Sequence, residues 1–509
     1  MFYFINVGFA DKRSGIEHAQ MQRLALFKKF QKKTQIVTRN FSLNLHDVLK
    51  RADLDDSDMI NLFDFFQGTE EMKARSFTIN DLKIKKSLQL LRNDQDEHGY
   101  MVRNSQRIIQ RIAMRAPEYT QVDVVRTFDQ LGKLVKSEWY DTRGFKGLEQ
   151  LYDGDSNVIA EQVFNPDGQV VYQTFHTKNG EDKLQNTLYR IVNYKGQDYS
   201  FNGEQAMMRF FLDELNKRNS EKNSFITDRT FELAWSVLNM KTPAYRYMHL
   251  HSNHLNDPDK ILDATLNYNY EYAIKNLEKW DGVLIPTEQQ RDDFVERYGN
   301  KTATFAIPVG NVSDEVMNSP HIPIEDRKAG NVVMVARLSP EKQQDQVIRA
   351  FKQVSEKVPN AHITFWGYAN GKEGPRLKKV VKDLNLEDVV TFEDYTADIN
   401  TVYDDAVLNL LTSRAEGFAL ALMEAQSHGI PNIAYDVTYG PHDIIIDGRN
   451  GRLVKLDDVD ALAQAIIETL QNPTELQKFS DNSYVDAERY SQDNIWKSWQ
   501  LLFNKQEEG

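Results

Sequence analysis

The feature that most constrains the fold is a repeated alternation of short apolar strands with helical segments. Near the N-terminus, the apolar run 2–7 is followed by a loop and then by residues 16–27, whose apolar side chains recur at helical spacing. Strands that alternate with helices form parallel sheets, so the pattern predicts an α/β fold with two doubly wound sheets. The expected strands are 2–7, 35–38, 224–227, 245–250, 282–285 and 304–307 for the first sheet, and 331–335, 361–366, 389–392, 406–411 and 432–435 for the second.

A different pattern interrupts this alternation. Residues from about 47 to 116 have a helical, charged pattern, and residues 120–201 form short alternating runs separated by turns such as Asn165-Pro166-Asp167-Gly168. We interpret this region as an inserted helical and antiparallel β-meander domain. The expected domains are 1–75 with 203–312, the insertion 76–202, and 313–493, with the helix within 494–509 crossing back to the first domain.

Composition excludes several classes of protein. The chain has 509 residues, too many for one hydrophobic core, and its net charge of -13 argues against a nucleic-acid-binding surface. There is no cysteine, which excludes disulfides, thiolate metal sites and cysteine nucleophiles. The N-terminal apolar run is too short for a signal peptide, and no run reaches the roughly 20 apolar residues of a membrane span. We therefore expect a cytoplasmic protein.

The strongest chemical signal is the segment Ser413 to Ala425, in which a strand end turns into a helix that carries Glu416 and Glu424. The N-terminus of such a helix offers free backbone N–H groups and a positive dipole end to a diphosphate. Upstream, Arg337 and Lys342 follow another strand, where two cations can stabilise charge on a leaving phosphate. The alternative is an ordinary turn with exposed glutamates and two solvated surface cations.

Together these segments resemble the family 4 retaining glycosyltransferases of the GT-B fold. The resemblance covers residues 331–454 and includes the Arg-x4-Lys element, the Trp366-Gly367 turn, the two glutamates and the stretch 447–454. It implies two Rossmann-like domains that face a cleft. One departure is Phe392-Glu393-Asp394-Tyr395, where the family has a glycine before the aromatic residue.

The resemblance also implies the site residues. A nucleoside-diphosphate sugar is the expected co-substrate, and neither a metal nor another cofactor is needed because fixed cations meet the diphosphate. The leaving phosphate itself would take the proton of the acceptor. The implied catalytic residues are Arg337, Lys342, Glu416 and His251, and the implied donor-binding residues are Gly15, Phe418, Ala419, Leu420, Glu424 and Tyr395.

Three histidines lie close together at the end of the expected strand 245–250. His249, His251 and His254 suggest a metal site, but a zinc site needs its ligands on one face and a further partner. The alternative is a set of partly satisfied loop histidines. The family resemblance favours His251 as a residue that contacts the sugar.

The N-terminal half narrows the resemblance to a Gram-positive subgroup, through residues 14–20, the meander and residues 439–445. This subgroup transfers N-acetylglucosamine to serine-rich or Ser-Asp-repeat adhesins, and related members glycosylate teichoic acid. It implies transfer from UDP-GlcNAc to serine hydroxyls, with a polyol-phosphate acceptor as the alternative. A non-catalytic glycoprotein-binding partner is a second alternative, and either a homo-oligomer or a partner glycosyltransferase is left open. An oxidoreductase is disfavoured because no G-x-G-x-x-G follows the first strand.

Four arginines recur at four-residue intervals before the meander: Arg103, Arg107, Arg111 and Arg115. On a helix they would form one cationic stripe about 18 Å long, from a rise of about 1.5 Å per residue. We expect this stripe to bind an anionic acceptor, unless neighbouring Asp and Glu residues neutralise it.

Overall fold

The computed structural model describes residues 1–93, 96–219 and 221–508. Parallel ladders join β1, β2 and β3, and likewise β15, β16 and β17, and β14 completes this first set of seven strands. The buried strands carry Phe4, Ile5, Val37 and Leu284, as expected where helices cover both faces of a sheet. The strands are β1 (Phe2–Asn6), β2 (Thr34–Thr38), β3 (Met59–Asn61), β14 (Ser224–Thr227), β15 (Tyr245–His249), β16 (Gly282–Ile285) and β17 (Thr304–Ala306).

Helices separate these strands along the chain. Helix α1 occupies the segment that the apolar spacing predicts, whereas α6 and α8 are single turns within longer loops. The helices are α1 (Gly15–Lys29), α2 (Leu45–Arg51), α3 (Leu62–Gln67), α4 (Glu204–Asn216), α5 (Thr230–Leu238), α6 (Glu271–Ile274), α7 (Glu288–Tyr298) and α8 (Asp314–Met317).

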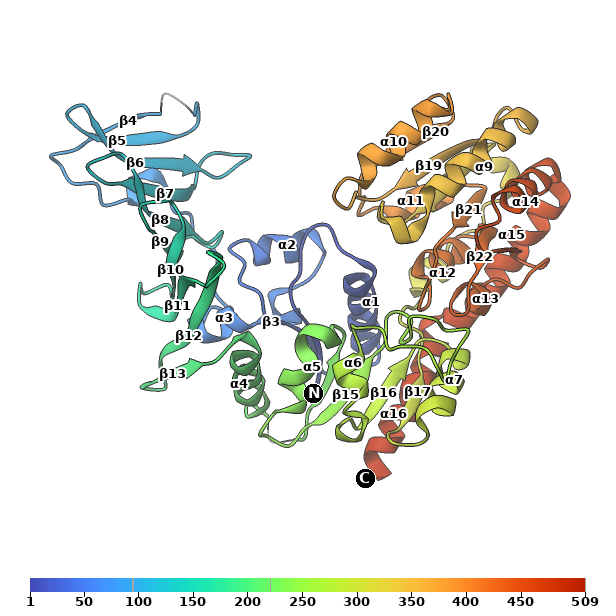
Figure 1. Cartoon of the computed structure of the whole chain (residues 1–509), viewed down its shortest axis with the longest axis horizontal. Coiled ribbons are helices and arrows are strands. Elements are labelled where there is room, and N and C mark those ends of the chain that lie inside the picture. Colours follow the sequence, from blue (N-terminus) through green and yellow to red (C-terminus); the bar gives the residue numbers. More distant parts are fainter. Residues whose placement is uncertain (94–95, 220, 509) are drawn as a thin grey trace. The chain divides into compact units, whose positions relative to one another are not determined.

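The insertion is a ten-stranded antiparallel sheet in which each strand pairs with the next along the chain (Figure 1). This confirms the predicted meander. The helical pattern expected up to residue 116 is wrong for residues 89–92, 100–104 and 107–114, which are strands. The strands are β4 (Gln89–Arg92), β5 (Tyr100–Asn104), β6 (Arg107–Met114), β7 (Val122–Phe128), β8 (Leu134–Tyr140), β9 (Lys146–Tyr152), β10 (Val158–Phe164), β11 (Val170–Lys178), β12 (Leu184–Tyr194) and β13 (Gln197–Phe201).

The reason for the difference is that a four-residue spacing fits both kinds of element. In a strand every second side chain shares a face, so positions four apart also lie on one face. Alternate residues Ile112 and Met114 are buried in a cluster with Val102 and Val122, which a strand satisfies. Ser105, with φ of 54°, lies in the turn between β5 and β6 and ends any helix there.

The last sheet is six-stranded and parallel, with the order β20-β19-β18-β21-β22-β23 (Figure 1). It confirms the second doubly wound sheet of the predicted fold class. Its strands are β18 (Asn331–Val335), β19 (His362–Trp366), β20 (Val390–Glu393), β21 (Leu408–Leu411), β22 (Asn432–Asp436) and β23 (Gly451–Lys455). Its helices are α9 (Gln344–Lys357), α10 (Glu373–Asp383), α11 (Ile399–Asp405), α12 (Leu420–Ser427), α13 (Pro441–Ile444), α14 (Val459–Gln471) and α15 (Pro473–Ala487).

The C-terminal helix α16 (Gln492–Glu508) packs through aromatic side chains. Trp499 and Trp496 lie edge-on to Phe27 of α1, with ring centroids 4.9 and 5.3 Å away. Near its end, Gln506 donates from its side chain to the hydroxyl of Tyr247 at 2.9 Å. These contacts bury Trp499 and hold α1 and β15 against the last helix.

The chain divides into two compact units. The first contains Met1–Asp11, Thr34–Phe225 and Glu232–Ala244, and the second contains Lys12–Lys33, Ile226–Phe231 and Tyr245–Gly509. Over the described ranges, no helix combines the length and the hydropathy needed to cross a membrane.

Candidate functional site

The strand order of the C-terminal sheet changes direction between β18 and β21. Strands β19 and β20 extend it on one side, whereas β22 and β23 extend it on the other. Ligands of open parallel sheets bind outside the carboxyl ends of the strands at such a switch point. Arg337 follows the end of β18 and Glu416 follows the end of β21, so both predicted groups belong to the loops that leave this point.

Lys342 and Glu416 form an ion pair. Lys342 Nζ lies 2.6 Å from Glu416 Oε1, and the side chains are only 18% and 12% exposed. Two further hydrogen bonds join the loops that carry them: the Arg414 N–H donates to the Glu341 carbonyl, and the Thr412 hydroxyl donates to the Lys342 carbonyl, both at 2.9 Å. The two loops therefore fix a largely buried cation beside a carboxylate.

Arg337 has a fixed backbone and a half-exposed side chain. Its carbonyl accepts from Gln344 Nε2 at 2.8 Å, and its guanidinium lies 3.2 Å from Glu341 in an ion pair that is 39% and 49% exposed. Exposed pairs of this kind are worth at most about 1 kcal/mol. A diphosphate can therefore compete successfully for the guanidinium.

The N-terminus of α12 has a strained backbone. Ala419, its N-cap residue, has φ of 75° and ψ of 66°, a left-handed conformation that is uncommon for residues other than glycine. Its neighbour Phe418 is buried edge-on against Tyr490. Such strain persists only where the surroundings hold it, and it clusters at ligand sites. At the start of α12 the Leu422 N–H donates to the Ala419 carbonyl at 3.0 Å, so the N–H groups that suit an anion are those of Leu420 and Ala421.

Gly417 brings the glutamate loop directly against the histidine loop. A Cβ atom at this position would lie 2.7 Å from the carbonyl carbon and oxygen of His251 and from Ser252 Cα. Backbone atoms cannot move away as a flexible side chain can, so only glycine fits. Glu416 and His251 are thereby placed on two loops in contact.

Gly15 begins α1 and faces the start of α12. A Cβ atom on Gly15 would lie 3.8 Å from Leu420 Cδ1, which is an ordinary contact. The helix start is fixed by a capping box between Ser14 and Glu17, and Arg229 Nη2 donates to Glu17 at 2.9 Å. Protein packing alone would accept a methyl group at Gly15, so the family's reason for glycine, a close approach to phosphate, remains a prediction.

Glu424 lies one helical turn further along α12. Gln22 Nε2 donates to Glu424 Oε1 at 3.2 Å, and the Tyr403 hydroxyl donates to Oε2 at 3.5 Å. Burial raises the pKa of Glu424 to about 7, although these two hydrogen bonds oppose the shift. The structure thus holds a carboxyl group whose charged form is poorly compensated within the protein.

His251 is oriented by a buried carboxylate, Asp228. His251 Nε2 lies 2.7 Å from Asp228 Oδ1, while Arg23 Nη2 donates to both oxygens at 2.7 and 2.8 Å and Gln20 Nε2 donates at 2.7 Å. Burial would raise the pKa of Asp228, but Arg23 and the histidines hold it well below its usual value. An ionised Asp228 therefore accepts from His251 Nε2 and fixes the ring.

The other two histidines are buried. Burial lowers the pKa of both His249 and His254 to about 3, so both are neutral at physiological pH. Among the described residues, Asp228, His249 and His251 have ligand atoms within 4.8 Å of one another, a grouping that could hold a metal ion. Arg23 Nη1, however, lies 2.9 Å from His249 Nδ1. The guanidinium thus supplies the positive charge that a metal would bring to this group.

Tyr395 lies in a small polar cluster after β20. Arg13 Nε donates to its hydroxyl at 3.2 Å, and His18 Nε2 lies 3.3 Å from the same oxygen. Burial, followed by Arg13, lowers the pKa of His18. Next to it, Lys12 and Asp394 form an exposed pair at 2.6 Å. The segment that departs from the family pattern is therefore tied to the start of α1 by its own contacts.

The four arginines lie on or beside the meander strands, which belong to the first unit. Arg107 and Arg111 are on β6, Arg103 is on β5, and Arg115 follows β6. Arg115 Nε lies 3.2 Å from Asp123 Oδ1, so an acidic neighbour neutralises this one arginine, as the alternative interpretation of the four arginines expects. A helical stripe is excluded, and acceptor binding by these residues remains a prediction.

Sequence reasoning missed Asp228, Arg23 and Gln22. Asp228 directly follows the apolar strand β14, and a polar residue at the carboxyl end of a parallel strand is a signal that was available. Arg23 and Gln22 lie within the helical run of α1, where polar residues are ordinarily solvated. Nothing in the local pattern marks them.

Known proteins resemble this chain in sequence and in fold. Residues 320–486 match the family described as Glycosyl transferases group 1. A poly(glycerol-phosphate) alpha-glucosyltransferase of Bacillus subtilis is 26% identical over 99% of this chain and 75% of its own length. The GtfA subunit of a Streptococcus pneumoniae UDP-N-acetylglucosamine–peptide N-acetylglucosaminyltransferase is 25% identical over 98% of this chain and 97% of its own. The crystal structure of the pneumococcal O-GlcNAc transferase GtfA with UDP and GlcNAc superposes with a TM-score of 0.82 at 21% identity, over 99% of this chain and 98% of that one.

Proposed function

Because the chain is a glycosyltransferase with a group 1 domain and the GT-B fold, we propose that it transfers N-acetylglucosamine from UDP-GlcNAc to serine hydroxyls of a repeat-rich surface protein, with retention of configuration. The observation that carries the proposal is the set of groups at the switch point. A buried lysine–glutamate pair, a second cation and the start of α12 come together there, with Glu424 one turn further on.

The diphosphate is the part of the donor that this set fits best. Lys342 and Arg337 are each paired with a glutamate, but the Arg337 pair is exposed and weak, so its guanidinium can turn to an incoming diphosphate. Preorganised cations and helix N–H groups stabilise the charge that develops on the leaving phosphate. Glu424 is assigned to the ribose hydroxyls, whose donated hydrogen bonds would supply the compensation that its buried carboxylate lacks.

The sugar is assigned to Glu416 and His251, which the close approach at Gly417 holds on adjoining loops. Asp228 accepts from His251 Nε2, which leaves Nδ1 as the nitrogen that can accept from a sugar hydroxyl. In the transfer, the bond from the anomeric carbon to the diphosphate oxygen breaks, and the serine oxygen bonds to the same face. The serine proton passes to the leaving phosphate oxygen, so UDP and the glycosylated serine are the products.

The acceptor assignment follows the relative from Streptococcus pneumoniae, which is named a peptide N-acetylglucosaminyltransferase subunit and matches nearly the whole chain. Because that relative is one subunit of its enzyme, a partner protein for this chain is part of the proposal. Transfer to a polyol-phosphate polymer is the second candidate, because the Bacillus subtilis relative is a poly(glycerol-phosphate) glucosyltransferase of similar identity. A non-catalytic binding partner is disfavoured, since binding alone does not require both cations and both glutamates.

The test is mass spectrometry of two acceptors after incubation with UDP-GlcNAc or UDP-glucose. One acceptor is a Ser-rich repeat peptide and the other is poly(glycerol phosphate), and Lys342→Ala serves as the matched inactive control. We expect the wild type, but not Lys342→Ala, to add N-acetylhexosamine to the peptide. If hexose is found on the polymer and the peptide stays unmodified, the function is transfer to a polyol-phosphate polymer instead of to serine.

A further inference from the structure

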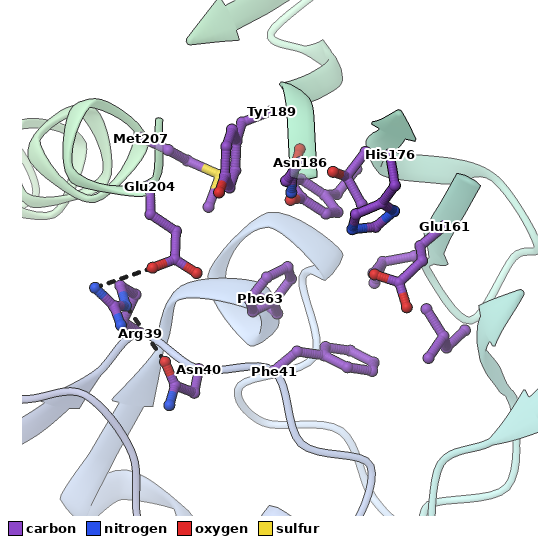
Figure 2. A pocket seen from close by; sticks show the side chains of 14 residues that line it. Arg39, Asn40, Phe41, Phe63, Glu161, His176, Asn186, Tyr189, Glu204 and Met207 are labelled. Atoms are coloured by element: carbon purple, nitrogen blue, oxygen red, sulfur yellow. Dashed lines mark hydrogen bonds and ion pairs between the residues drawn. The ribbon is translucent and has the colours of Figure 1, made fainter. Parts of the chain in front are cut away.

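A second pocket lies in the first unit and shares no residue with the site described above. One face of strands β9 to β12, the loop after β2, α3 and the start of α4 line an open pocket of about 500 Å³ (Figure 2). Small-molecule sites typically span roughly 300–1,000 Å³. The pocket is therefore large enough for a single small ligand.

The meander face is built by register. Tyr172, Thr174 and His176 are alternate residues of β11 and so point to one face. Across the neighbouring strand, Tyr189 pairs with Thr174 and Asn186 pairs with His176. These cross-strand pairs place an alternating set of aromatic and polar side chains on one wall.

The centre of the pocket is aromatic. Phe63 packs edge-on against Phe41 and Tyr172, with ring centroids 5.0 and 5.3 Å away. Phe63 and Tyr172 are 9% and 6% exposed, so their positions are fixed by packing. Edge-on packing of this kind stabilises the cluster beyond the area that it buries.

Polar groups flank the aromatic centre on two sides. Figure 2 shows Arg39 and Glu204 on one side and Glu161 and His176 on the other. Arg39 and Glu204 form an ion pair at 3.2 Å, and Glu161 accepts from Gln150 Nε2 at 2.7 Å. His176 Nδ1 is buried and, within the described part of the chain, has no hydrogen-bond partner. A buried polar atom of this kind costs free energy that a ligand hydrogen bond would recover.

The charges decide which chemistry fits. The pocket is lined by two carboxylates and one guanidinium, which Glu204 already pairs, so a phosphate or carboxylate ligand would meet net repulsion. A purely apolar ligand would leave His176 Nδ1 unsatisfied and would remove water from the Glu161 carboxylate, to which Gln150 donates. A neutral ring with one apolar face and several hydroxyl groups satisfies both constraints, because its C–H face can cover Phe63 while its hydroxyls reach the polar flanks.

We propose that this pocket binds a glycosyl residue already attached to the acceptor. This role rests on the proposed function, since only a repeat-rich acceptor carries modified and unmodified serines on one chain. A modified repeat held here keeps the acceptor bound while another serine reaches the transfer site. Transfer should then be faster on a partly glycosylated acceptor than on an unmodified one.

The binding test uses methyl α-N-acetylglucosaminide and the full-length protein with saturating UDP, followed by saturation-transfer NMR and titration. The pocket variant is Glu161→Gln with Asn186→Ala, and the matched control is Gln185→Ala, whose side chain lies on the exposed face of β12. Lys342→Ala reports on the donor site. We expect the dissociation constant to rise at least tenfold in the pocket variant and to be unchanged in both others. Equal binding by all four proteins, or competition by inorganic phosphate at the pocket, would overturn the proposal.

A rate comparison separates this inference from the proposed function. With an unmodified peptide the pocket variant should match the wild-type initial rate, whereas the advantage of a pre-glycosylated peptide should disappear. Circular dichroism melting verifies that the pocket variant folds. Glycoside binding needs no turnover, so a chain that binds the glycoside but transfers nothing contradicts only the proposed function. A chain that transfers sugar without binding the glycoside contradicts only the pocket assignment.

Discussion

Replacing Glu424 with Gln should stabilise the protein at alkaline pH and weaken its binding to UDP. Burial raises the pKa of Glu424 from the model-peptide value of 4.5 to about 7. For a carboxyl group whose folded pKa is raised, stability is fully present below pH 4.5 and is lost as the pH rises through about 7. A difference of about 2.5 pKa units corresponds to about 3 kcal/mol at full ionisation, at roughly 1.4 kcal/mol per unit.

The variant removes this titration. Its gain in unfolding free energy over the wild type should therefore be about 2.5 kcal/mol larger at pH 8 than at pH 5, from the same linkage. Thermal melts at the two pH values measure the difference, which corresponds to several degrees in Tm for a unit of this size. Parallel pH profiles for the two proteins would show that Glu424 does not titrate as described.

The same substitution should reduce UDP affinity roughly ten- to a hundredfold, because hydrogen bonds to a charged group contribute about 1.5–3 kcal/mol. Calorimetric titration with UDP at pH 8 measures this loss. A variant that is more stable but binds UDP more weakly would show that the Glu424 carboxylate serves ligand binding and lowers the stability of the free protein. Unchanged UDP affinity would remove Glu424 from the donor site.

Three further predictions address other residues. Lys342→Ala and Arg337→Ala should each lower kcat by roughly two to three orders of magnitude, by loss of one preorganised stabiliser of the leaving phosphate, and steady-state kinetics with near-normal kcat would remove that residue from the site. Asp228→Asn should destabilise the second unit by about 3–5 kcal/mol, because it leaves a buried arginine without its carboxylate, and should also lower kcat; a Tm and a rate equal to wild type would refute the positioning role. Replacing Arg107 and Arg111 together with Ser should raise the KM for a long anionic acceptor and reduce its salt dependence, while hydrolysis of the sugar nucleotide stays constant; an unchanged KM would make these arginines structural.

The fold was largely predictable because the strands and helices of each sheet follow from the spacing of apolar residues within short segments. Apolar runs flanked by helical spacing predicted β1 and β18 close to their observed bounds, and turn residues such as Gly168 predicted the meander. The spacing of Arg103 to Arg115 failed as a guide, because four residues are two strand repeats as well as about one helical turn. The β-branched Ile108, Ile109 and Ile112 were the better signal there.

The site was predictable only where it is local in sequence. Glu416 and Glu424 share one strand–helix turn, so their relation can be read from the chain. The partner of Asp228, by contrast, is Arg23, which is 205 positions away. The pocket around Phe63 depends on the register of several strands and leaves no motif at all.

The central claim is that the groups at the switch point of the second sheet bind a sugar nucleotide and transfer its sugar without a metal ion. The most direct measurement is mass spectrometry of a Ser-rich peptide after incubation with UDP-GlcNAc, with and without excess chelator, for the wild type and Lys342→Ala. We expect equal modification of the peptide by the wild type in both conditions and at most about one hundredth of that rate for the variant. Modification that chelator abolishes and a divalent ion restores, or a variant as fast as the wild type, would contradict it.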